Sequence, residues 1–195
     1  MDEITFNTPS IIKLGSFAGK IKYCLIDTYF ISLLNIYKLK INYINNQLIV
    51  IATNGLKDIP LHNLIWEYFY QYSISENYSI YHQNGITMDN RLENLLLISN
   101  NIVYLPLKSY SLSSFYWKII SYLPVDMDEV NYHSTKLNRS SLYECHNAPC
   151  TQLLLNSSDE QFICLKCKKI KYCSQMCQTM DADIHSIFCN PNNSK

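Results

Sequence analysis

The chain has 195 residues, of which 48% are hydrophobic types and 16% are charged, a composition typical of a folded protein. Sixteen basic residues balance sixteen acidic ones, so no net charge attracts nucleic acid or anionic lipid, and no nucleic-acid partner is expected. The longest apolar runs are far shorter than the ~20 residues that span a bilayer, and the first residues lack the pattern of a secretory signal. We therefore expect a soluble intracellular protein without a transmembrane segment.

The first hundred residues are predicted to alternate strands and helices. Turns are expected at Leu14-Gly15, at 18–19 and at 45–46, and a loop is expected over 56–60. Strands are expected over 21–26, 38–44 and 47–53. Helices are expected over about 28–37, capped by Asp27 or Thr28, and over 61–70. This order of elements favours an α+β domain in which a helix packs on a small sheet.

A strand that ends at His82 precedes Asn84-Gly85 and then the segment Asp-Asn-Arg-Leu-Glu-Asn-Leu at 89–95. This arrangement resembles the ββα motif of HNH endonucleases, and the resemblance covers about residues 11–100. It implies that His82 occupies the position of the general base. The preceding position normally holds a metal-binding acid or histidine, but here it is Tyr81, whose neutral phenol is a poor Mg²⁺ ligand. We expect a degenerate HNH-like domain with no catalytic residue, with a metal-dependent nuclease as the alternative.

Residues 109–123 carry apolar side chains at helical spacing before Pro124, which predicts an amphipathic helix that packs against the first domain. The predicted apolar face consists of Leu112, Phe115, Tyr116, Ile119, Ile120 and Leu123. The residues after Pro124 are acidic and then polar, which predicts a linker. The predicted organisation is an HNH-like domain (1–100), a bridging helix (101–124), a linker (125–142) and a cysteine-rich module (143–190).

Seven of the eight cysteines lie between positions 145 and 189. An odd number of thiols cannot pair evenly as disulfides, whereas two cysteines separated by two or three residues can hold one zinc ion. His185 and Cys189 lie one helical turn apart, as ligands of one site would. The eight candidate metal ligands, enough for two closed zinc sites, are Cys145, Cys150, Cys164, Cys167, Cys173, Cys177, His185 and Cys189. The wide spacing of the first pair leaves His146 as an alternative to Cys145.

From Cys164 onward the spacing is Cys-x2-Cys-x5-Cys-x3-Cys-x7-His-x3-Cys, with Tyr172 and Gln178 beside the third and fourth cysteines. This pattern resembles a MYND zinc finger. The resemblance implies crossed ligation by two sets of four residues. The sets would be Cys145, Cys150, Cys173 and Cys177 for one ion, and Cys164, Cys167, His185 and Cys189 for the other.

Four protein ligands leave each ion no open position for water, so both zinc ions are expected to be structural. About 50 residues cannot build a sufficient apolar core unaided, so we expect the module to unfold when the metal is removed. MYND fingers bind short proline-containing peptides in a groove near the last helix. This chain departs from the family at Ala182, where a tryptophan is usual.

Five blocks in order along the chain are similar to those of small receptor-interacting proteins of the MYND zinc-finger family. The blocks are 13–20, 22–27, 61–67, 89–94 and 143–151. This resemblance implies a non-enzymatic cytoplasmic adaptor, peripheral at the plasma membrane. Its implied partners are the cytoplasmic tail of a G-protein-coupled receptor and tubulin. A recruiter of transcriptional corepressors is a further alternative.

Overall fold

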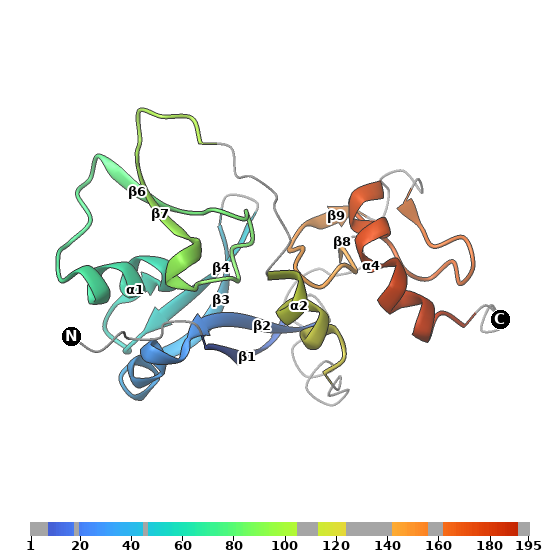
Figure 1. The fold of residues 1–195 in the computed structure, drawn as a ribbon, viewed down its shortest axis with the longest axis horizontal. Helices are drawn as coiled ribbons and strands as arrows, with labels where there is room; N and C mark the ends of the chain where they lie inside the picture. The colour runs from blue at the N-terminus through green and yellow to red at the C-terminus, as the bar shows by residue number, and fades with distance from the viewer. Residues whose placement is uncertain are drawn as a thin grey trace. The chain divides into compact units, whose positions relative to one another are not determined.

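The computed structural model describes residues 8–17, 20–44, 47–104, 113–123, 142–155 and 162–190. Helices and strands are mixed along the chain, which confirms the α+β prediction (Figure 1). The chain divides into two compact units. The N-terminal unit comprises Met1–Gly15 and Lys22–Ser111, and the C-terminal unit comprises Ser16–Ile21 and Leu112–Lys195. The turns predicted at 18–19 and 45–46, and all but the last residue of the predicted linker, lie outside the described residues.

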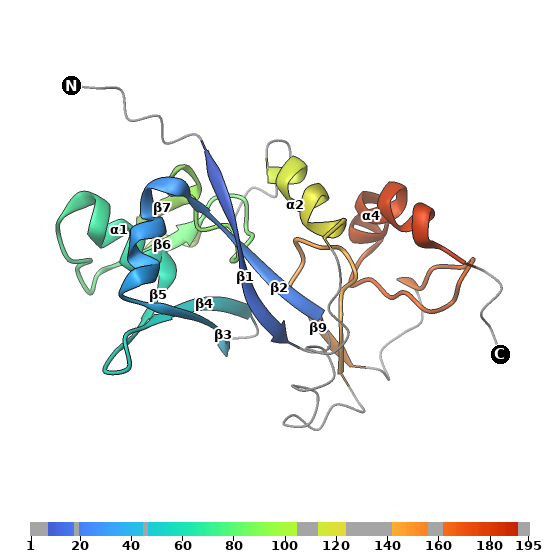
Figure 2. The same ribbon diagram turned by 90° about the horizontal axis from the view of Figure 1, so that it is seen from below.

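The described part of the N-terminal half of the chain contains three small sheets (Figures 1 and 2). The first pairs β1 (Pro9–Phe17) with β2 (Lys20–Asp27). The second is antiparallel and has the order β3 (Lys38–Ile44), β4 (Gln47–Thr53) and β5 (Asp58–Pro60). The third pairs β6 (Tyr78–His82) with β7 (Leu95–Ser99) in antiparallel register, so that His82 lies opposite Leu95. The strands predicted over 21–26, 38–44 and 47–53 are confirmed.

Helix α1 (Leu61–Tyr70) has the predicted bounds and lies against β4 and β5. Its residues Leu61, Leu64 and Ile65 are buried, because they recur at the three- to four-residue spacing that places side chains on one helix face. Fully buried apolar side chains from β2, β4, α1 and the short helix after β2 form the core. They are Leu25, Ile26, Phe30, Leu48, Val50, Leu61 and Ile65. This core contains no candidate metal ligand.

Two local predictions in the N-terminal half are wrong, and a third, the helix after β2, is confirmed only in part. Strand β1 continues through Gly15, whose φ of +99° is open to glycine but strained for other residues, so the expected turn at Leu14-Gly15 is absent. The loop predicted over 56–60 contains β5, which pairs with β4. The helix after β2 is the 3₁₀ helix η1 (Thr28–Asn35), and the side chain of its N-cap residue, Asp27, makes no capping bond.

Asp27 instead fixes the turn that leads into β7. Its Oδ2 accepts the backbone N–H of Leu92, the first residue of the 3₁₀ helix η2 (Leu92–Asn94), at 2.7 Å. Strand β2 is hydrogen-bonded to the same turn through Leu25. The N–H of Leu25 donates to the carbonyl of Met88, and the carbonyl of Leu25 accepts the N–H of Asn90. The predicted helical turn within 89–95 is thus present, and long-range bonds hold it.

A buried polar network holds the chain between β6 and β7. Asp89 is fully buried and forms an ion pair with Arg91, whose Nε and Nη2 each lie 2.8 Å from a different carboxylate oxygen. Asn84 donates from Nδ2 to Asp89 at 2.8 Å, and the Asn84 N–H donates to the side chain of Asn94 at 2.9 Å. Buried polar groups are costly unless they are paired, and these groups pair with one another.

The described part of the C-terminal unit contains α2 (Ser113–Ser121), β8 (Leu142–Glu144), β9 (Leu153–Leu155) and α4 (Gln175–Phe188) (Figure 1). Of the predicted bridging segment 101–124, residues 105–112 and 124 lie outside the described residues. In α2, Ile120 is buried as predicted, but Phe115 and Ile119 are exposed and the second buried side chain is Trp117. The predicted apolar face is therefore wrong in part. None of the described helices combines the length and apolar character needed to cross a membrane.

We predict that Arg91→Met destabilises the N-terminal unit by about 3–5 kcal/mol, because it leaves the buried Asp89 carboxylate without its cation. The measurement is urea unfolding in a Trp117→Phe background, in which Trp66 is the remaining tryptophan and reports on this unit.

Lys40→Met is the matched control. The Lys40–Asp58 pair is about half exposed, and breaking such a surface pair costs no more than about 1 kcal/mol. Equal losses in the two variants would contradict the structural role assigned to the Asp89–Arg91 pair.

Candidate metal centre

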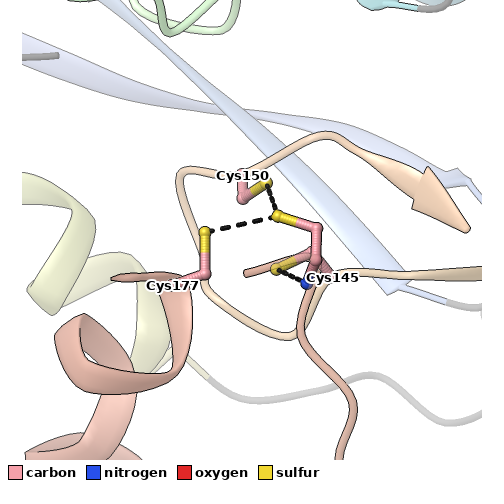
Figure 3. Close-up of side chains that lie close together, drawn as sticks. Cys145, Cys150 and Cys177 are labelled. Atoms are coloured by element: carbon pink, nitrogen blue, oxygen red, sulfur yellow. Dashed lines mark hydrogen bonds between the residues drawn. The ribbon is translucent and has the colours of Figure 1, made fainter. Parts of the chain in front are cut away.

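The first candidate metal site gathers four cysteines from two parts of the chain. Cys145 follows β8, Cys150 lies in the turn after it, and Cys173 and Cys177 come from the start of α4 and the residues before it. Their four sulfur atoms lie within 4.8 Å of one another. Figure 3 shows Cys145, Cys150 and Cys177 of this group with their side chains turned toward a common centre.

The second candidate site gathers the remaining four predicted residues. Cys164 and Cys167 lie in a tight turn, whereas His185 and Cys189 lie at the end of α4. The three sulfur atoms and a ring nitrogen of His185 lie within 4.8 Å of one another. Along the chain the two sites interleave, since the pair at 164 and 167 falls between the two pairs of the first site. The structure therefore brings together both predicted groups of four.

The donor distances in both groups fit zinc coordination. Zn–S bonds of about 2.3 Å in a regular tetrahedron place neighbouring sulfur atoms about 3.8 Å apart, and a sulfur and an imidazole nitrogen about 3.5 Å apart. In the first group the Cys150–Cys173 and Cys173–Cys177 sulfur distances are 3.6 and 3.5 Å. In the second, the Cys164–Cys189 sulfur distance is 3.8 Å and Cys167 Sγ lies 3.5 Å from His185 Nε2. All eight cysteines of the chain are free thiols.

The turn at Cys164–Cys167 is shaped to favour a thiolate. Lys168 adopts a left-handed backbone conformation with φ of 54°, and its N–H donates to the Cys164 carbonyl at 2.8 Å. Burial raises the pKa of the Cys167 thiol, but hydrogen bonds with the backbone N–H groups of Lys169 and Ile170, together with those to Cys164 and His185, lower the pKa to about 6. Backbone donors therefore compensate part of the negative charge in the second site.

The start of α4 has a similar effect in the first site. Ser174 caps the helix by accepting the N–H of Cys177 at 3.2 Å, so Cys177 lies in the first helical turn, where the helix dipole favours an anion. Hydrogen bonds among the four thiols, that with Cys145 first, lower the pKa of Cys177 and bring that of Cys173 to about 7.

The other two thiols of the first site, Cys145 and Cys150, have raised pKa values instead. The neighbouring sulfur atoms raise the pKa of Cys150, and the pKa of Cys145 is also raised. Four sulfur atoms this close cannot all ionise unless a cation balances their charge. A divalent soft-metal ion would supply that charge and displace the remaining protons.

The apolar packing of the finger consists largely of the candidate ligands themselves. Cys145, Cys177 and Tyr172 form its buried cluster, and Cys150, Cys173, Phe162 and Ile170 pack around them partly exposed. A core this small contributes little apolar burial on its own.

Asp181 is the functional residue that the sequence analysis missed. It is 2% exposed on α4, and its Oδ2 accepts hydrogen bonds from Tyr172 Oη at 2.8 Å and from His146 Nδ1 at 2.7 Å. His146, the alternative to Cys145 as a ligand, thus faces Asp181. The signal was present in the sequence, because Asp181 lies four residues after Cys177 and four before His185, on the same face of α4.

The HNH-like segment of the N-terminal half lacks a comparable donor group. His82 Nε2 lies 3.3 Å from Asn90 Oδ1, and the His82 ring packs edge-on against His62 with the centroids 5.0 Å apart. The Tyr81 ring contacts the Tyr104 ring in a tilted arrangement, with the centroids 5.3 Å apart. Among the described residues, the groups of three or more histidine, cysteine or acidic side chains that could hold a metal all lie between 145 and 189.

Burial keeps both histidines of this pair neutral. It lowers the pKa of His62 from 6.5 to about 3, with His82 as a second cause, and it also lowers the pKa of His82. His62 Nδ1 is buried without a hydrogen-bond partner. The pair therefore resists protonation as long as the unit is folded.

We predict that the N-terminal unit loses stability as the pH falls from 6.5 toward 3. In this window the unfolded chain binds protons on His62 and His82 that the folded chain excludes, so the free energy of unfolding rises with pH, by at most about 1.4 kcal/mol per pH unit for each histidine. Urea unfolding measured at several pH values tests this. His62→Phe should flatten the dependence, and an unchanged slope in that variant would contradict the prediction.

Comparisons with known proteins agree with the two halves of this description. Residues 60–103 match the family model described as HNH endonuclease, and residues 143–189 match the model described as MYND finger. No solved structure was found to match the chain. The first match covers α1, β6 and β7, and the second covers all eight candidate ligands. The protein thus has an HNH-like N-terminal domain and a C-terminal MYND finger whose cysteine clusters are suited to zinc.

Proposed function

We propose that the protein is a zinc-binding adaptor that docks partner proteins through its MYND finger. The observation that carries the zinc assignment is the set of donor distances, because 3.5–3.8 Å is the edge length of a tetrahedron built on zinc and is far too long for disulfides. The proposed ligands are Cys145, Cys150, Cys173 and Cys177 for one ion, and Cys164, Cys167, His185 and Cys189 for the other. Each site has four protein donors, which supports a structural role for both ions.

The surface of the finger supports a docking role. Leu165 is 88% exposed beside the Cys164–Cys167 turn, and Phe188 is 64% exposed at the end of α4, with Ile187 and Met176 also exposed on that helix. Apolar side chains held at the surface by a rigid framework are typical of interaction sites. Since Ala182 replaces the tryptophan usual in the family, we propose that these side chains provide the apolar contacts to a partner peptide.

We also propose which classes of partner the protein binds. The five sequence blocks that span most of the chain are similar to the melanin-concentrating hormone receptor-interacting zinc-finger protein. On that resemblance we propose a receptor cytoplasmic tail and tubulin as partner classes, and a location in the cytoplasm and at the inner face of the plasma membrane. The match to the MYND family supports protein interaction in general and does not identify a partner.

A metal-dependent nuclease is the second candidate, because residues 60–103 match the HNH endonuclease family. Hydrolysis of this kind needs a divalent ion held by hard donors beside the general base. Tyr81 occupies the expected ligand position and contacts the Tyr104 ring, and His82 is buried against His62 and Asn90. These contacts favour a structural role for the HNH-like domain over a catalytic one.

We predict that native mass spectrometry of the full chain finds two zinc ions. Cys173→Ser and Cys167→Ser should each lose one ion or both, whereas Cys24→Ala should keep two, because Cys24 is buried in β2 outside both clusters. Removing the metal with a chelator should abolish the protease resistance of 143–190, since zinc contributes on the order of 10–16 kcal/mol in finger peptides. Fewer than two ions in the wild type, or unchanged protease resistance without metal, would refute the zinc proposal.

The adaptor and nuclease proposals differ in two measurable outcomes. We predict that the full chain does not cleave supercoiled plasmid DNA with Mg²⁺ or Mn²⁺ above the level of His82→Ala. We also predict that it captures proteins that Cys173→Ser fails to capture, because that substitution removes one proposed zinc ligand. Plasmid cleavage that disappears in His82→Ala would overturn the adaptor proposal in favour of the nuclease.

A further inference from the structure

Asp181 lies midway between the ligands that α4 contributes to the two sites. It is four residues from Cys177 of the first site and four from His185 of the second, so the three side chains share one face of the helix. The helix segment from Cys177 to His185 spans about 12 Å. Cys177, Asp181 and His185 are also the buried residues of this helix. The carboxylate is therefore enclosed between the two metal sites.

The hydrogen bonds of Asp181 reach both chain segments that supply the first site. Tyr172, which donates to Oδ2, directly precedes Cys173, and His146, which donates to the same oxygen, directly follows Cys145. The N–H of His146 donates to the carbonyl of Lys171 at 3.0 Å, so the backbone holds these two segments side by side.

Asp181 is also within reach of the histidine of the second site. A ring nitrogen of His185, the carboxylate of Asp181 and a ring nitrogen of His146 lie within 4.8 Å of one another, and the two imidazole rings contact with centroids 5.6 Å apart. His185 presents Nε2 to Cys167. A histidine that binds metal through Nε2 needs an acceptor for its other N–H, and a carboxylate is a common one.

The group formed by His146, Asp181 and His185 is not a third metal site. Oδ2 of Asp181 already accepts two hydrogen bonds, Nδ1 of His146 makes one of them, and His185 belongs to the second site. A metal ion there would have to displace both bonds and one ligand of the second site. The arrangement is instead a hydrogen-bonded network that touches both sites.

We propose that Asp181 is a positioning residue shared by the two zinc sites and couples their metal affinities. It orients His185 in the second site, and through Tyr172 and His146 it fixes the segments that carry Cys173 and Cys145 in the first. Metal bound at either site holds Asp181 in place and so preorganises the other, which makes binding positively cooperative. This inference rests on the proposed zinc binding.

The test compares Asp181→Asn with Asp183→Asn in the full chain. Asp183 is exposed on the same helix two residues away, so its variant makes the same chemical change without touching the network. Cobalt(II) titration, followed by the d–d bands that distinguish a four-thiolate site from a three-thiolate, one-imidazole site, reports on each site separately. Asp181→Asn should weaken cobalt binding about 10- to 100-fold at both sites and abolish the cooperativity, whereas Asp183→Asn should behave as the wild type.

Two further measurements extend the test, and the first of them does not depend on the folding of Asp181→Asn. Tyr172→Phe removes only one hydroxyl group and should weaken the four-thiolate site more than the other. In zinc-loaded protein, the nitrogen chemical shift of His185 Nδ1 should change in Asp181→Asn and stay constant in Asp183→Asn, which a general loss of stability would not produce.

The possible outcomes distinguish a failure of the role proposed for Asp181 from a failure of the zinc proposal on which that role rests. A wild-type chain that binds fewer than two cobalt ions overturns the zinc proposal itself. A wild type that binds two ions overturns the role of Asp181 if Asp181→Asn keeps both affinities and the His185 shift. A loss confined to the second site overturns the coupling between the sites.

Discussion

The spacing of sulfur and nitrogen donors around two points is the constraint on which the C-terminal finger depends. Donors 3.5–3.8 Å apart come from segments that are far apart in the chain, and an ion bound by all four donors of a site would hold these segments together more tightly than the small apolar cluster can. The raised pKa values of Cys145 and Cys150 mean that four neighbouring thiols do not all ionise without a balancing cation. We therefore expect metal binding and folding of this half to be coupled.

The N-terminal half reaches stability by other means. Its core of fully buried aliphatic side chains spans β2, β4 and α1, and its polar network pairs Asp89 with Arg91. His82, at the position where the HNH motif has its general base, contacts His62 and Asn90. The two halves thus differ in what is expected to stabilise each: the proposed zinc ions for one, and a pH that keeps its histidines neutral for the other.

Much of this structure was predictable from local sequence, because local features decide it. Alternating apolar residues bounded by Asn and Gly predict β3 and β4, helical spacing predicts α1, and cysteine spacing predicts the eight candidate ligands, whose division into two groups of four came from the MYND resemblance. The wrong predictions have other causes. Asp27 was predicted as a helix cap, but its carboxylate accepts the N–H of Leu92, 65 residues later, and the burial of Trp117 instead of Phe115 does not follow from helical spacing. Asp181 lacked a visible role until Tyr172 and His146 were placed beside it.

The contact between Tyr81 and Tyr104 has a consequence for building a metal site into the HNH-like domain. A histidine placed at position 81 would replace one ring of this tilted pair, whose centroids lie 5.3 Å apart, and His82 beside it would still be buried. Such a substitution alone would give up an aromatic contact without bringing the neighbouring imidazole into contact with solvent.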